Sequence, residues 1–576
     1  MRVCTAKQMA AIDRAAIDGG VPASELMERA GRALADHVLE FVAEHADSGH
    51  GHDHGHDHDH DHDHGHDHAC GDSACEGHEG GCDEAGGATV LVVCGKGNNG
   101  GDGLVVARLV HEEGLAAIVL LLAGPKELSK EALKNLERLP DGVEVVAPPP
   151  EAWVEAFDEL SGEATVVVDA VLGTGKQGAL GPELAALFRA MNDAAVPTLA
   201  VDVPSGVNGD DGTVDPVAVA ADVTVTIGLP KLGLLLPPGR DYAGRLEVVD
   251  IGFDPAVCAK LAGPWHWLQR QEYLGLLPPR PTSVHKGQCG SLVVLAGSRS
   301  YGGAAHLAAL GGLRSGAGLV TVAAPVGLET ALRVALPEAL VRPLAETAAG
   351  TLAPPEARDV DALLAGADAL VIGPGLGDDP ATDAWVRDLL ARSTLPMVVD
   401  ADGLNALARG GVTPAFGGRQ VVLTPHPGEF ARLAGLPVAE VAARRLELAA
   451  WAADTWGAVV VLKGSPAFIG VPGEGAFVNA TGDDALARGG AGDVLAGLIA
   501  GLLAQGLPAR DAALLGCYVH GLAGTAAARE MSSRGVLVRE VAAAIGPQWL
   551  ALEREASGVA ELRERLWPSL PPEGAR

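Results

Sequence analysis

Short apolar runs rich in β-branched residues alternate with stretches of helical periodicity along most of the chain. Six such runs lie in the first half, at 89–94, 116–122, 143–146, 165–169, 197–202 and 222–227. Nearly continuous apolar runs between helices are typical of strands that are covered on both faces. We therefore predict a mostly parallel sheet in this half.

The chain has two proline-rich stretches, one around 230–240 and the other at PPRP (278–281). The alternation of strands and helices starts again after the second. Strands are predicted at 291–297, 318–324, 367–373, 396–402, 420–425 and 458–464, and helices at 6–18, 23–45, 492–505, 508–530 and 538–555. No fixed period recurs, so the pattern indicates tandem α/β domains rather than a solenoid. We predict a Rossmann-like three-layer α/β/α domain over residues 1–255, a linker at 256–280, a second α/β/α domain over 281–556 and a tail at 557–576.

A low-complexity insert at 49–86 interrupts the first domain. It holds eleven histidines between His50 and His78, and residues 50–85 carry eleven acidic residues without a lysine or arginine. Without apolar periodicity the insert cannot build a core, so we predict a disordered surface loop. Imidazole and carboxylate groups suit nickel, zinc or cobalt, but a flexible tract sets no coordination geometry, so such binding would be adventitious. The alternative is a solvated acidic loop.

Composition narrows the possible partners. A net charge of −32 over 576 residues argues against nucleic acid or an anionic membrane as a partner. No apolar run approaches the roughly eighteen residues of a membrane span, and the first residues lack an apolar signal core, so we expect a cytoplasmic protein. The eight cysteines are scattered, which disfavours a disulfide framework.

A glycine-rich loop, GKGNNGGDG (95–103), follows the first predicted strand. It fits the G-x-G-x-x-G pattern of dinucleotide-binding turns, whose backbone N–H groups favour anions. That pattern also needs an acidic residue about twenty positions later, and AIVLLLAG (117–124) has none, which disfavours an ordinary NAD oxidoreductase. The Asn and Asp side chains of the loop could instead hold a hard monovalent cation or a carboxamide.

Two further strand ends carry polar residues, in VDAVLGTG (168–175) and VDVPSG (201–206). In a doubly wound sheet these ends and the glycine-rich loop meet at the carboxyl edge, where ligands bind. Asp169 and Asp202 could each simply cap a turn. The combination of three such motifs favours a ligand site.

Together with LMERAG (26–31), these motifs resemble the NAD(P)H-hydrate epimerase domain over residues 1 to about 255. The resemblance implies a potassium ion held by Asn99, Asp169 and Ser205, and Asp202 as the acid/base that inverts the hydroxyl-bearing carbon of the damaged ring. The residues implied to contact the hydrated nucleotide are Asn98, Asn99, Gly100, Gly101, Asp102, Gly173, Thr174, Gly175, Lys176, Gln177, Gly178 and Asp202. The His/Asp insert departs from the family pattern but falls before the first strand.

The second domain contains NATGDDALARGGAGD (479–493) directly before an apolar helix. Glycines before a helix present N–H groups to a phosphoryl in transfer, and Asp493 could take the proton of the hydroxyl that is phosphorylated. The alternative is a glycine turn in which Asp493 caps the helix. No Walker A motif occurs, so a P-loop enzyme is excluded.

Other predicted strand ends in this domain agree with a ligand edge. GPGLG (373–377) is a stiff turn, and Asp400, Asp402 and Asn405 suit either a magnesium shell or a structural cap. His426 stands between two prolines at the same edge, and Lys463 follows another strand. We interpret His426 as functional rather than structural.

The turn GAGD (490–493) resembles the ribokinase superfamily. Residues 280 to about 550 resemble the ADP- or ATP-dependent NAD(P)H-hydrate dehydratase domain. The motifs that carry this resemblance are HKG (285–287), YGGA (301–304), GPGLG (373–377), DADGLNAL (400–407), LTPHPGEF (423–430), LKG (462–464) and GAGD. The resemblance implies a ribokinase-like fold and Mg²⁺ with ADP or ATP. The implied hydrate contacts are Ala304, Gly375, His426 and Asp493, and the implied nucleotide contacts are Lys463, Gly464, Ser465, Pro466, Ala467 and Gly492. The family usually has Thr or Ser at the positions of Arg488 and Ala491 and Pro at that of Asp484, so possible phosphate contacts are lost.

The leading hypothesis is a bifunctional repair enzyme. Its partners would be NAD(P)H hydrate and an adenine nucleotide, and we expect a homo-oligomer. One alternative is a kinase of a small hydroxylated metabolite with an N-terminal binding module. Another is a metal-buffering protein whose histidine-rich insert is the functional part.

Overall fold

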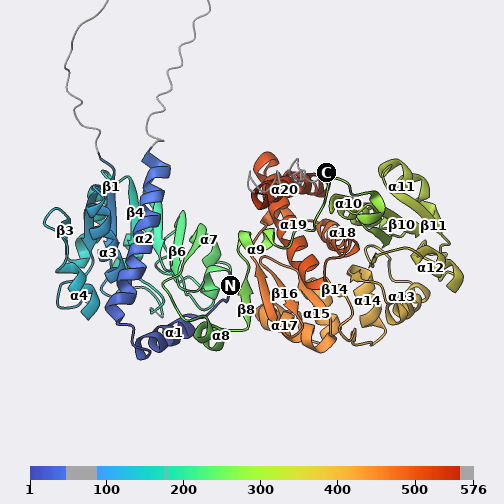
Figure 1. Cartoon of the computed structure of the whole chain (residues 1–576), viewed down its shortest axis with the longest axis horizontal. Coiled ribbons are helices and arrows are strands. Elements are labelled where there is room, and N and C mark those ends of the chain that lie inside the picture. Colours follow the sequence, from blue (N-terminus) through green and yellow to red (C-terminus); the bar gives the residue numbers. More distant parts are fainter. Residues whose placement is uncertain (47–86, 176–177, 558–576) are drawn as a thin grey trace, which may run out of the picture. The chain divides into compact units, whose positions relative to one another are not determined.

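The computed structural model describes residues 1–46, 87–175 and 178–557, and they form two compact units (Figure 1). One unit comprises Cys4–Ala262 and the other Met1–Val3 with the chain from Gly263 onward. The His/Asp insert, Lys176, Gln177 and nearly all of the predicted tail lie outside the described residues. Within those residues, no helix combines the length and apolar character that crossing a membrane requires.

The first unit is built around a parallel seven-stranded sheet. Its strands are β1 (Thr89–Cys94), β2 (Ala116–Leu121), β3 (Glu144–Val146), β4 (Val166–Ala170), β5 (Thr198–Val201), β6 (Val223–Ile227) and β7 (Arg245–Val249). The spatial order is β3-β2-β1-β4-β5-β6-β7, so the winding direction reverses between β1 and β4. This is the doubly wound arrangement that places ligands at the carboxyl ends next to the reversal.

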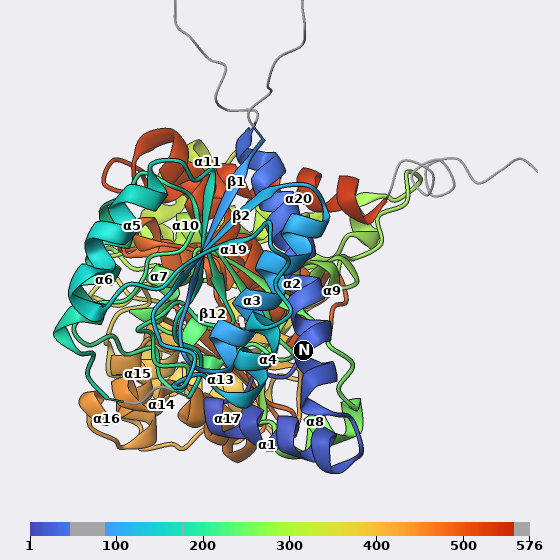
Figure 2. The ribbon, with the colours of Figure 1, turned by 90° about the vertical axis from the view of Figure 1, so that its left-hand side faces the viewer.

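Helices cover both faces of this sheet. They are α1 (Ala6–Asp18), α2 (Ala23–Ala46), α3 (Asn98–Glu112), α4 (Lys130–Leu136), α5 (Trp153–Ser161), α6 (Pro182–Asp193), α7 (Gly239–Ala243) and α8 (Pro255–Leu261). Figure 2 shows α5 and α6 on one side of β1 and β2 and α2 and α3 on the other, and alternate residues of β1 point into the two corresponding cores. The predicted three-layer α/β/α domain is confirmed.

The second unit contains a ten-stranded sheet. Its strands are β8 (Trp265–Trp267), β9 (Ser291–Leu295), β10 (Leu319–Pro325), β11 (Leu340–Leu344), β12 (Ala369–Ile372), β13 (Met397–Val399), β14 (Val421–Leu423), β15 (Val459–Leu462), β16 (Ala467–Val471) and β17 (Gly475–Asn479). The order is β11-β10-β9-β12-β13-β14-β15-β16-β17-β8. Strands β11 to β15 are parallel, β16 pairs antiparallel on both sides, and the winding reverses between β9 and β12.

The helices of this unit are α9 (Arg270–Leu274), α10 (Gly302–Arg314), α11 (Glu329–Ala335), α12 (Ala357–Leu364), α13 (Pro380–Arg392), α14 (Ala401–Arg409), α15 (Pro427–Ala434), α16 (Val438–Ala443), α17 (Arg445–Trp456), α18 (Ala491–Ala504), α19 (Ala509–Met531) and α20 (Val538–Ala556). Helix α18 is apolar all round and almost completely buried, as expected for a helix at the centre of a core. The predicted second α/β/α domain is thus present.

Helices α10 and α18 pack backbone against backbone. A Cβ atom at Gly497 would lie 1.8 Å from the carbonyl oxygen of Ala308, and one at Gly311 would lie 2.2 Å from that of Val494. Only glycine allows this approach. The two helices that begin beside the predicted ligand edge are therefore in direct contact along their length.

The segment 256–280, which the sequence predicts to be a linker, carries regular structure. It includes most of α8, strand β8 and helix α9, and the two compact units divide between Ala262 and Gly263. Strand β8 pairs with β17 and so belongs to the second sheet.

Candidate functional site

A pocket of about 800 Å³ lies at the carboxyl edge of the seven-stranded sheet. Each of the seven strands is followed by a residue that lines it, from Ile251 after β7 to Trp153 after β3. The glycine-rich loop after β1 and the Val171–Gly175 turn after β4 meet in the middle, at the reversal of the winding. The three motifs chosen from the sequence therefore converge on one site.

Asp202 forms the polar floor of this pocket together with Lys231. The Lys231 Nζ lies 2.5 Å from Asp202 Oδ1, and this lysine is only 1% exposed. Ile227 N and Thr226 Oγ1 also donate to Oδ1, at 3.0 and 3.3 Å. The hydrogen bonds that the Asp202 carboxylate accepts from these residues all reach Oδ1, and Asp202 itself lines the pocket.

The backbone of Asp202 supports a functional role. Its φ of 67° lies in the left-handed region, which a residue other than glycine adopts at a cost in strain. The strained residue also carries the carboxylate that contacts the buried lysine. An Asp that merely caps a turn has no need of such a lysine, so the capping interpretation of Asp202 loses its support.

Two further carboxyl groups line the pocket near this ion pair. Burial raises the pKa of Asp13 to about 6, with Lys231 opposing the shift and Asp202 adding to it. Burial, together with the charges of Asp202 and Asp13, also raises the pKa of Asp102 well above its ordinary value. The floor of the pocket thus combines one cation with three carboxyl groups, and burial raises the pKa of two of them, Asp13 and Asp102.

The three residues predicted to hold potassium partly meet. Asp169 and Ser205 are fully buried, and Asp169 accepts from the Ser205 hydroxyl at 2.6 Å and from the Ser205 N–H at 2.7 Å. Asn99 is 8% exposed, its Nδ2 has no partner among the described residues, and it contacts Gly173 of the adjoining turn. A half-turn of this amide would present its oxygen at the same position.

This set of donors fits a hard monovalent cation. It offers a carboxylate, a hydroxyl and an amide, all of them oxygen ligands. Burial raises the pKa of Asp169 to about 6 despite its hydrogen bonds to Ser205 and Val171, which is the situation that a nearby cation would relieve. No cluster of three or more His, Cys, Asp or Glu side chains suited to a metal occurs in the described part of the chain.

Most of the predicted contact residues of this site reach the pocket. Its lining includes Asn98, Asn99, Asp102, Gly173, Thr174, Gly175 and Asp202. Gly100 and Gly101 are buried in the first turn of α3, where a Cβ at Gly100 would lie 1.9 Å from the Gly95 carbonyl oxygen. Gly178 lines a smaller neighbouring cavity of about 180 Å³ instead.

The second site lies at the start of α18. Lys463 Nζ is 2.8 Å from Asp400 Oδ1 and 3.9 Å from Glu429 Oε2, and a Cβ at Gly492 would lie 3.1 Å from the same nitrogen. The turn that carries Asp493 is therefore next to the lysine. Burial and the charge of Asp400 raise the pKa of Asp493 to about 7, with Lys463 opposing the shift. A carboxyl group that titrates there is suited to general acid–base work.

His426 is both a helix cap and a wall of this site. Its Nδ1 accepts from Gly428 N at 3.0 Å, and its Nε2 lies 3.4 Å from Glu429 Oε1. Burial, with the charges of Lys463 and Arg432, lowers the pKa of His426. The ring is half exposed and neutral, with Nε2–H available as a donor.

Two of the residues predicted to contact the hydrate, Ala304 and Gly375, lie together. A Cβ at Gly375, whose φ is +63°, would lie 2.7 Å from the Ala304 Cβ and 2.8 Å from the Tyr301 carbonyl oxygen. The GPGLG turn and the start of α10 are thus in contact at the reversal between β9 and β12. Only glycine fits at position 375.

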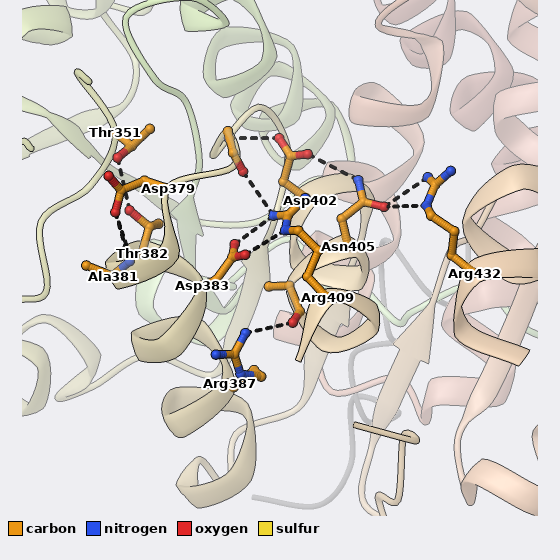
Figure 3. A network of polar contacts seen from close by, with 12 residues as sticks. Thr351, Asp379, Ala381, Thr382, Asp383, Arg387, Asp402, Asn405, Arg409 and Arg432 are labelled. Carbon is orange, nitrogen blue, oxygen red and sulfur yellow. Dashed lines mark hydrogen bonds and ion pairs between the residues drawn. The ribbon is translucent and has the colours of Figure 1, made fainter. Parts of the chain in front are cut away.

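A polar network holds the GPGLG turn (Figure 3). Asp402 Oδ2 accepts from Gly377 N at 2.8 Å, while Arg409 reaches both oxygens of Asp383 at 2.6 Å and the Gly377 carbonyl oxygen at 3.3 Å. Asn405 donates to Asp402 Oδ1 and accepts from Arg432. Of the two interpretations of Asp402, the structure supports the structural cap, because both its oxygens are engaged.

Residues that depart from the family pattern hold a neighbouring turn. Arg488 donates to the Ser533 carbonyl oxygen, and Asp484 accepts from the Ser533 hydroxyl at 2.8 Å. Ala491 is the first residue of α18 and contacts His520, whose pKa burial lowers to about 4. Arg488 and Asp484 thus connect the glycine-rich turn to the α19–α20 connection, and Ala491 contacts α19 itself.

The implied nucleotide loop, Lys463–Ala467, is held by an arginine from α17. Arg445 donates to the Pro466 carbonyl oxygen at 3.1 Å and the Ser465 carbonyl oxygen at 3.4 Å, and its guanidinium stacks over the Phe468 ring. The loop adjoins the Lys463–Asp400 ion pair.

Comparisons with known proteins match both units of the chain. Residues 292–546 match the family model described as NAD(P)H-hydrate dehydratase, and residues 23–233 match that of the YjeF-related protein N-terminus. A bifunctional NAD(P)H-hydrate repair enzyme Nnr of Moorella thermoacetica is 40% identical over 453 residues, which are 78% of this chain and 86% of the relative. The chain belongs to the family of bifunctional NAD(P)H-hydrate repair enzymes.

Other members of the repair-enzyme family are similar over comparable lengths. The Salinibacter ruber enzyme is 34% identical over 90% of this chain and 91% of its own length, and the Escherichia coli enzyme is 36% identical over 78% and 83%. Among solved structures, the ADP/ATP-dependent NAD(P)H-hydrate dehydratase of Bacillus subtilis, co-crystallised with ATP and Mg²⁺, is 31% identical. It covers 50% of this chain and 98% of its own, with a TM-score of 0.43.

Sequence reasoning missed several residues of these sites. Lys231 follows β6 in a proline-containing loop, and Asp13 lies on the first helix, so neither belongs to a glycine motif. Asp400 and Glu429 stand inside the motifs DADGLN and TPHPGE, but only the fold shows that both face Lys463. A search for charged residues after every strand end would have found Lys231.

Proposed function

We propose that this protein repairs hydrated nicotinamide nucleotides in two steps. The first site interconverts the R and S forms of NAD(P)H hydrate, and the second dehydrates the S form to NAD(P)H at the expense of ADP or ATP. The observation that carries the proposal is the pair of acid–base carboxylates, Asp202 and Asp493, each at the carboxyl edge of a sheet beside a lysine. Family membership supports the same assignment.

In the first site Asp202 moves the proton during inversion at the hydroxyl-bearing carbon. Lys231 and Thr226 hold Oδ1, so Oδ2 is the atom that gives and takes the proton. Asp13 and Asp102 hold protons at neutral pH more readily than ordinary carboxyl groups, so they can donate hydrogen bonds to the ring carboxamide or hydroxyl. The glycine-rich loop receives the diphosphate at the start of α3.

Potassium is the cation we assign to this site, with Asn99, Asp169 and Ser205 as the residues that would hold it. When bound, the ion would supply a fixed positive charge beside the substrate. The donor set and the raised pKa of Asp169 support this assignment.

In the second site Asp493 accepts the proton of the ring hydroxyl as that oxygen attacks the terminal phosphorus of the nucleotide. The N–H groups of the turn before α18 stabilise the charge on the transferring phosphoryl. Lys463 and the Ser465–Ala467 loop bind the nucleotide phosphates. The carbon–oxygen bond then breaks and phosphate leaves with the electron pair, and the adjacent ring carbon loses a proton, so that the ring double bond of NAD(P)H is restored.

Mg²⁺ is expected to enter with the nucleotide. Asp402 is engaged by Gly377 and Asn405, and Asp400 by Lys463, so neither is available as part of an all-protein cage. Mg²⁺ commonly binds through substrate phosphates together with only one or two protein carboxylates. Asp493 and one oxygen of a neighbouring aspartate are enough for such a site.

A second candidate function is a kinase of a small hydroxylated metabolite. It shares the first chemical step, phosphoryl transfer to a hydroxyl next to Asp493. It does not account for the Asp202–Lys231 pair in the other unit. Homo-oligomer formation, and adventitious binding of nickel, zinc or cobalt by the insert, stay predictions.

The experiment mixes the protein with both epimers of hydrated NADPH and with ADP or ATP, and follows the absorbance of the reduced nicotinamide. Full recovery is expected, whereas stable phosphorylated product without recovery would support the kinase. Asp493→Asn should abolish dehydration and leave epimer exchange, and Asp202→Asn should do the reverse. Simultaneous loss of both activities in each variant would refute this division of labour.

A further inference from the structure

The pocket of the first unit is longer than a hydrated nicotinamide ring requires. Its lining runs from Lys231 after β6, past the glycine-rich loop after β1, to Leu122 after β2 and Trp153 after β3. Adjacent strands lie roughly 4.8 Å apart, so the end of β5, which carries Asp202, is about 14 Å from the end of β2. That span suits a whole dinucleotide with its diphosphate at the central loop.

The ends of this pocket differ in chemistry. Asp202 and Lys231 occupy the β5–β6 end, where the reaction takes place. The β2–β3 end is lined by Leu122, Pro150 and Trp153, whose indole N–H donates to the Pro148 carbonyl oxygen at 3.2 Å. An aromatic ring held in place beside apolar side chains is a platform for a purine base. The adenosine half of the substrate therefore belongs at this end.

The segment after β2 is tied to the phosphate loop. Ser129 N donates to the Lys96 carbonyl oxygen at 2.9 Å, and Ser129 Oγ donates to Asn98 Oδ1 at 3.0 Å. Within the same segment, Glu127 Oε2 accepts from Gly124 N at 3.0 Å, and Glu127 lines the pocket. These bonds fix a carboxylate between the phosphate loop and the purine platform.

Glu127 stands on the loop after β2, the strand after which dinucleotide-binding folds commonly position an acidic residue for the adenosine ribose. The side chain is exposed, and it forms no ion pair with any residue that the structure describes. Solvent and Lys96, which also lines the pocket, weaken its charge without pairing with it. A ribose 2′-hydroxyl can donate to Oε1, whereas a 2′-phosphate would be repelled by the carboxylate.

We propose that Glu127 contacts the adenosine ribose of the substrate and makes the first site selective for the hydrate of NADH over that of NADPH. The proposal rests on the epimerase function assigned above. The 2′-phosphate carries nearly two negative charges, and repulsion across roughly 5 Å of well-hydrated space gives a preference on the order of tenfold. The preference arises in binding, so it acts on KM rather than kcat.

The test measures epimer exchange by NMR on the full-length protein with no ADP or ATP present, so that dehydration does not run. The wild type should show a kcat/KM for NADH hydrate on the order of tenfold above that for NADPH hydrate, decreasing with added salt. Glu127→Gln should bring the ratio close to one by lowering KM for NADPH hydrate. The matched control Glu137→Gln, an exposed carboxylate at the end of α4 outside the pocket, should leave the ratio unchanged.

A second variant tests the orientation of the substrate. Trp153→Ala should raise KM for both dinucleotide hydrates equally and leave the hydrate of reduced nicotinamide mononucleotide unaffected. A wild-type ratio near one, or a ratio that Glu127→Gln does not change, overturns the assignment of Glu127. Equal loss with the mononucleotide in Trp153→Ala overturns the orientation. A wild type that exchanges no hydrate at all would instead contradict the proposed function.

Discussion

The ionisation of Asp493 sets the expected pH dependence of dehydration. Its carboxyl group must be deprotonated to accept the hydroxyl proton, and burial with the charge of Asp400 raises its pKa to about 7. The rate should therefore rise with pH through the neutral range. An ordinary aspartate would already be fully ionised there.

The size of the effect follows from the pKa. With a value of about 7, roughly 10% of the free enzyme carries ionised Asp493 at pH 6, about half at pH 7 and about 90% at pH 8. Between pH 6 and pH 8, kcat/KM should thus increase about ninefold. Replacing Lys463 by Met removes the opposing cation, so the midpoint should move to higher pH.

The assay uses the pure S epimer, so the first site is not needed, and records the return of reduced-nicotinamide absorbance at saturating Mg²⁺ and ADP. At saturating ADP, the kcat/KM profile for the hydrate reports the nucleotide-bound enzyme whose hydrate site is empty. A flat profile from pH 5.5 to pH 8, or a midpoint near pH 4, would refute the role of a raised Asp493 pKa.

The same carboxylate has a consequence for stability. Its folded pKa lies above the unfolded value of 3.8, so the folded state binds the proton more tightly, and stability falls as pH rises from about 4 to about 7. The difference corresponds to at most about 4 kcal/mol above pH 7. The Asp493→Asn variant should therefore unfold at a higher denaturant concentration than the wild type at pH 8, but not at pH 4. The control Glu530→Gln changes an exposed residue of α19 and should unfold like the wild type at both pH values.

Four further outcomes follow from the structure. Lys231→Met leaves Asp202 without its partner, so it should abolish epimer exchange and lower the free energy of unfolding by about 3 kcal/mol. Dehydration of the S form should continue, and retained epimer exchange would contradict the role of the ion pair. Potassium should raise the Tm of the wild type relative to sodium, and Asp169→Asn should remove that difference; a potassium effect in the variant would exclude this site. Asp383→Asn loosens the GPGLG turn and should raise KM for the hydrate several-fold with little change in kcat, as steady-state kinetics can show. Deleting residues 50–68 should leave turnover intact, and a collapse in activity would support a metal-dependent function for the insert.

Strand and helix positions were largely predictable because buried parallel strands have an unmistakable apolar pattern. Strands β7 and β11 were not predicted, since RLEVV and LVRPL carry charges typical of sheet edges. The β16–β17 hairpin was missed because its glycines weaken the apolar signal, and β8 has only three residues. Strands β7 and β11 lie at sheet edges and are partly exposed, whereas β16 and β17 are buried like the central strands.

The glycine motifs located both sites, but they did not reveal the charges that work in them. Lys231, Asp13 and Glu127 come from loops and a helix without a recognisable spacing, and tertiary structure alone brings them to the pocket. Glu127 was overlooked because the acidic residue was sought within β2, whereas it stands on the loop beyond it. For Asp402 the motif was misleading. Its position suggested a magnesium ligand, whereas in the structure its carboxylate accepts a hydrogen bond from Gly377 N.

The glycine contact between α10 and α18 limits how the second unit can move. With no side chains between them, the two helices cannot slide or tilt without steric overlap of main-chain atoms. The gap between Ala304 and the Asp493 turn is therefore set before any ligand arrives. Any opening and closing of the second site must therefore occur in the loops around α10 and α18. Substrate can then enter and leave without a change in the alignment of the reacting groups.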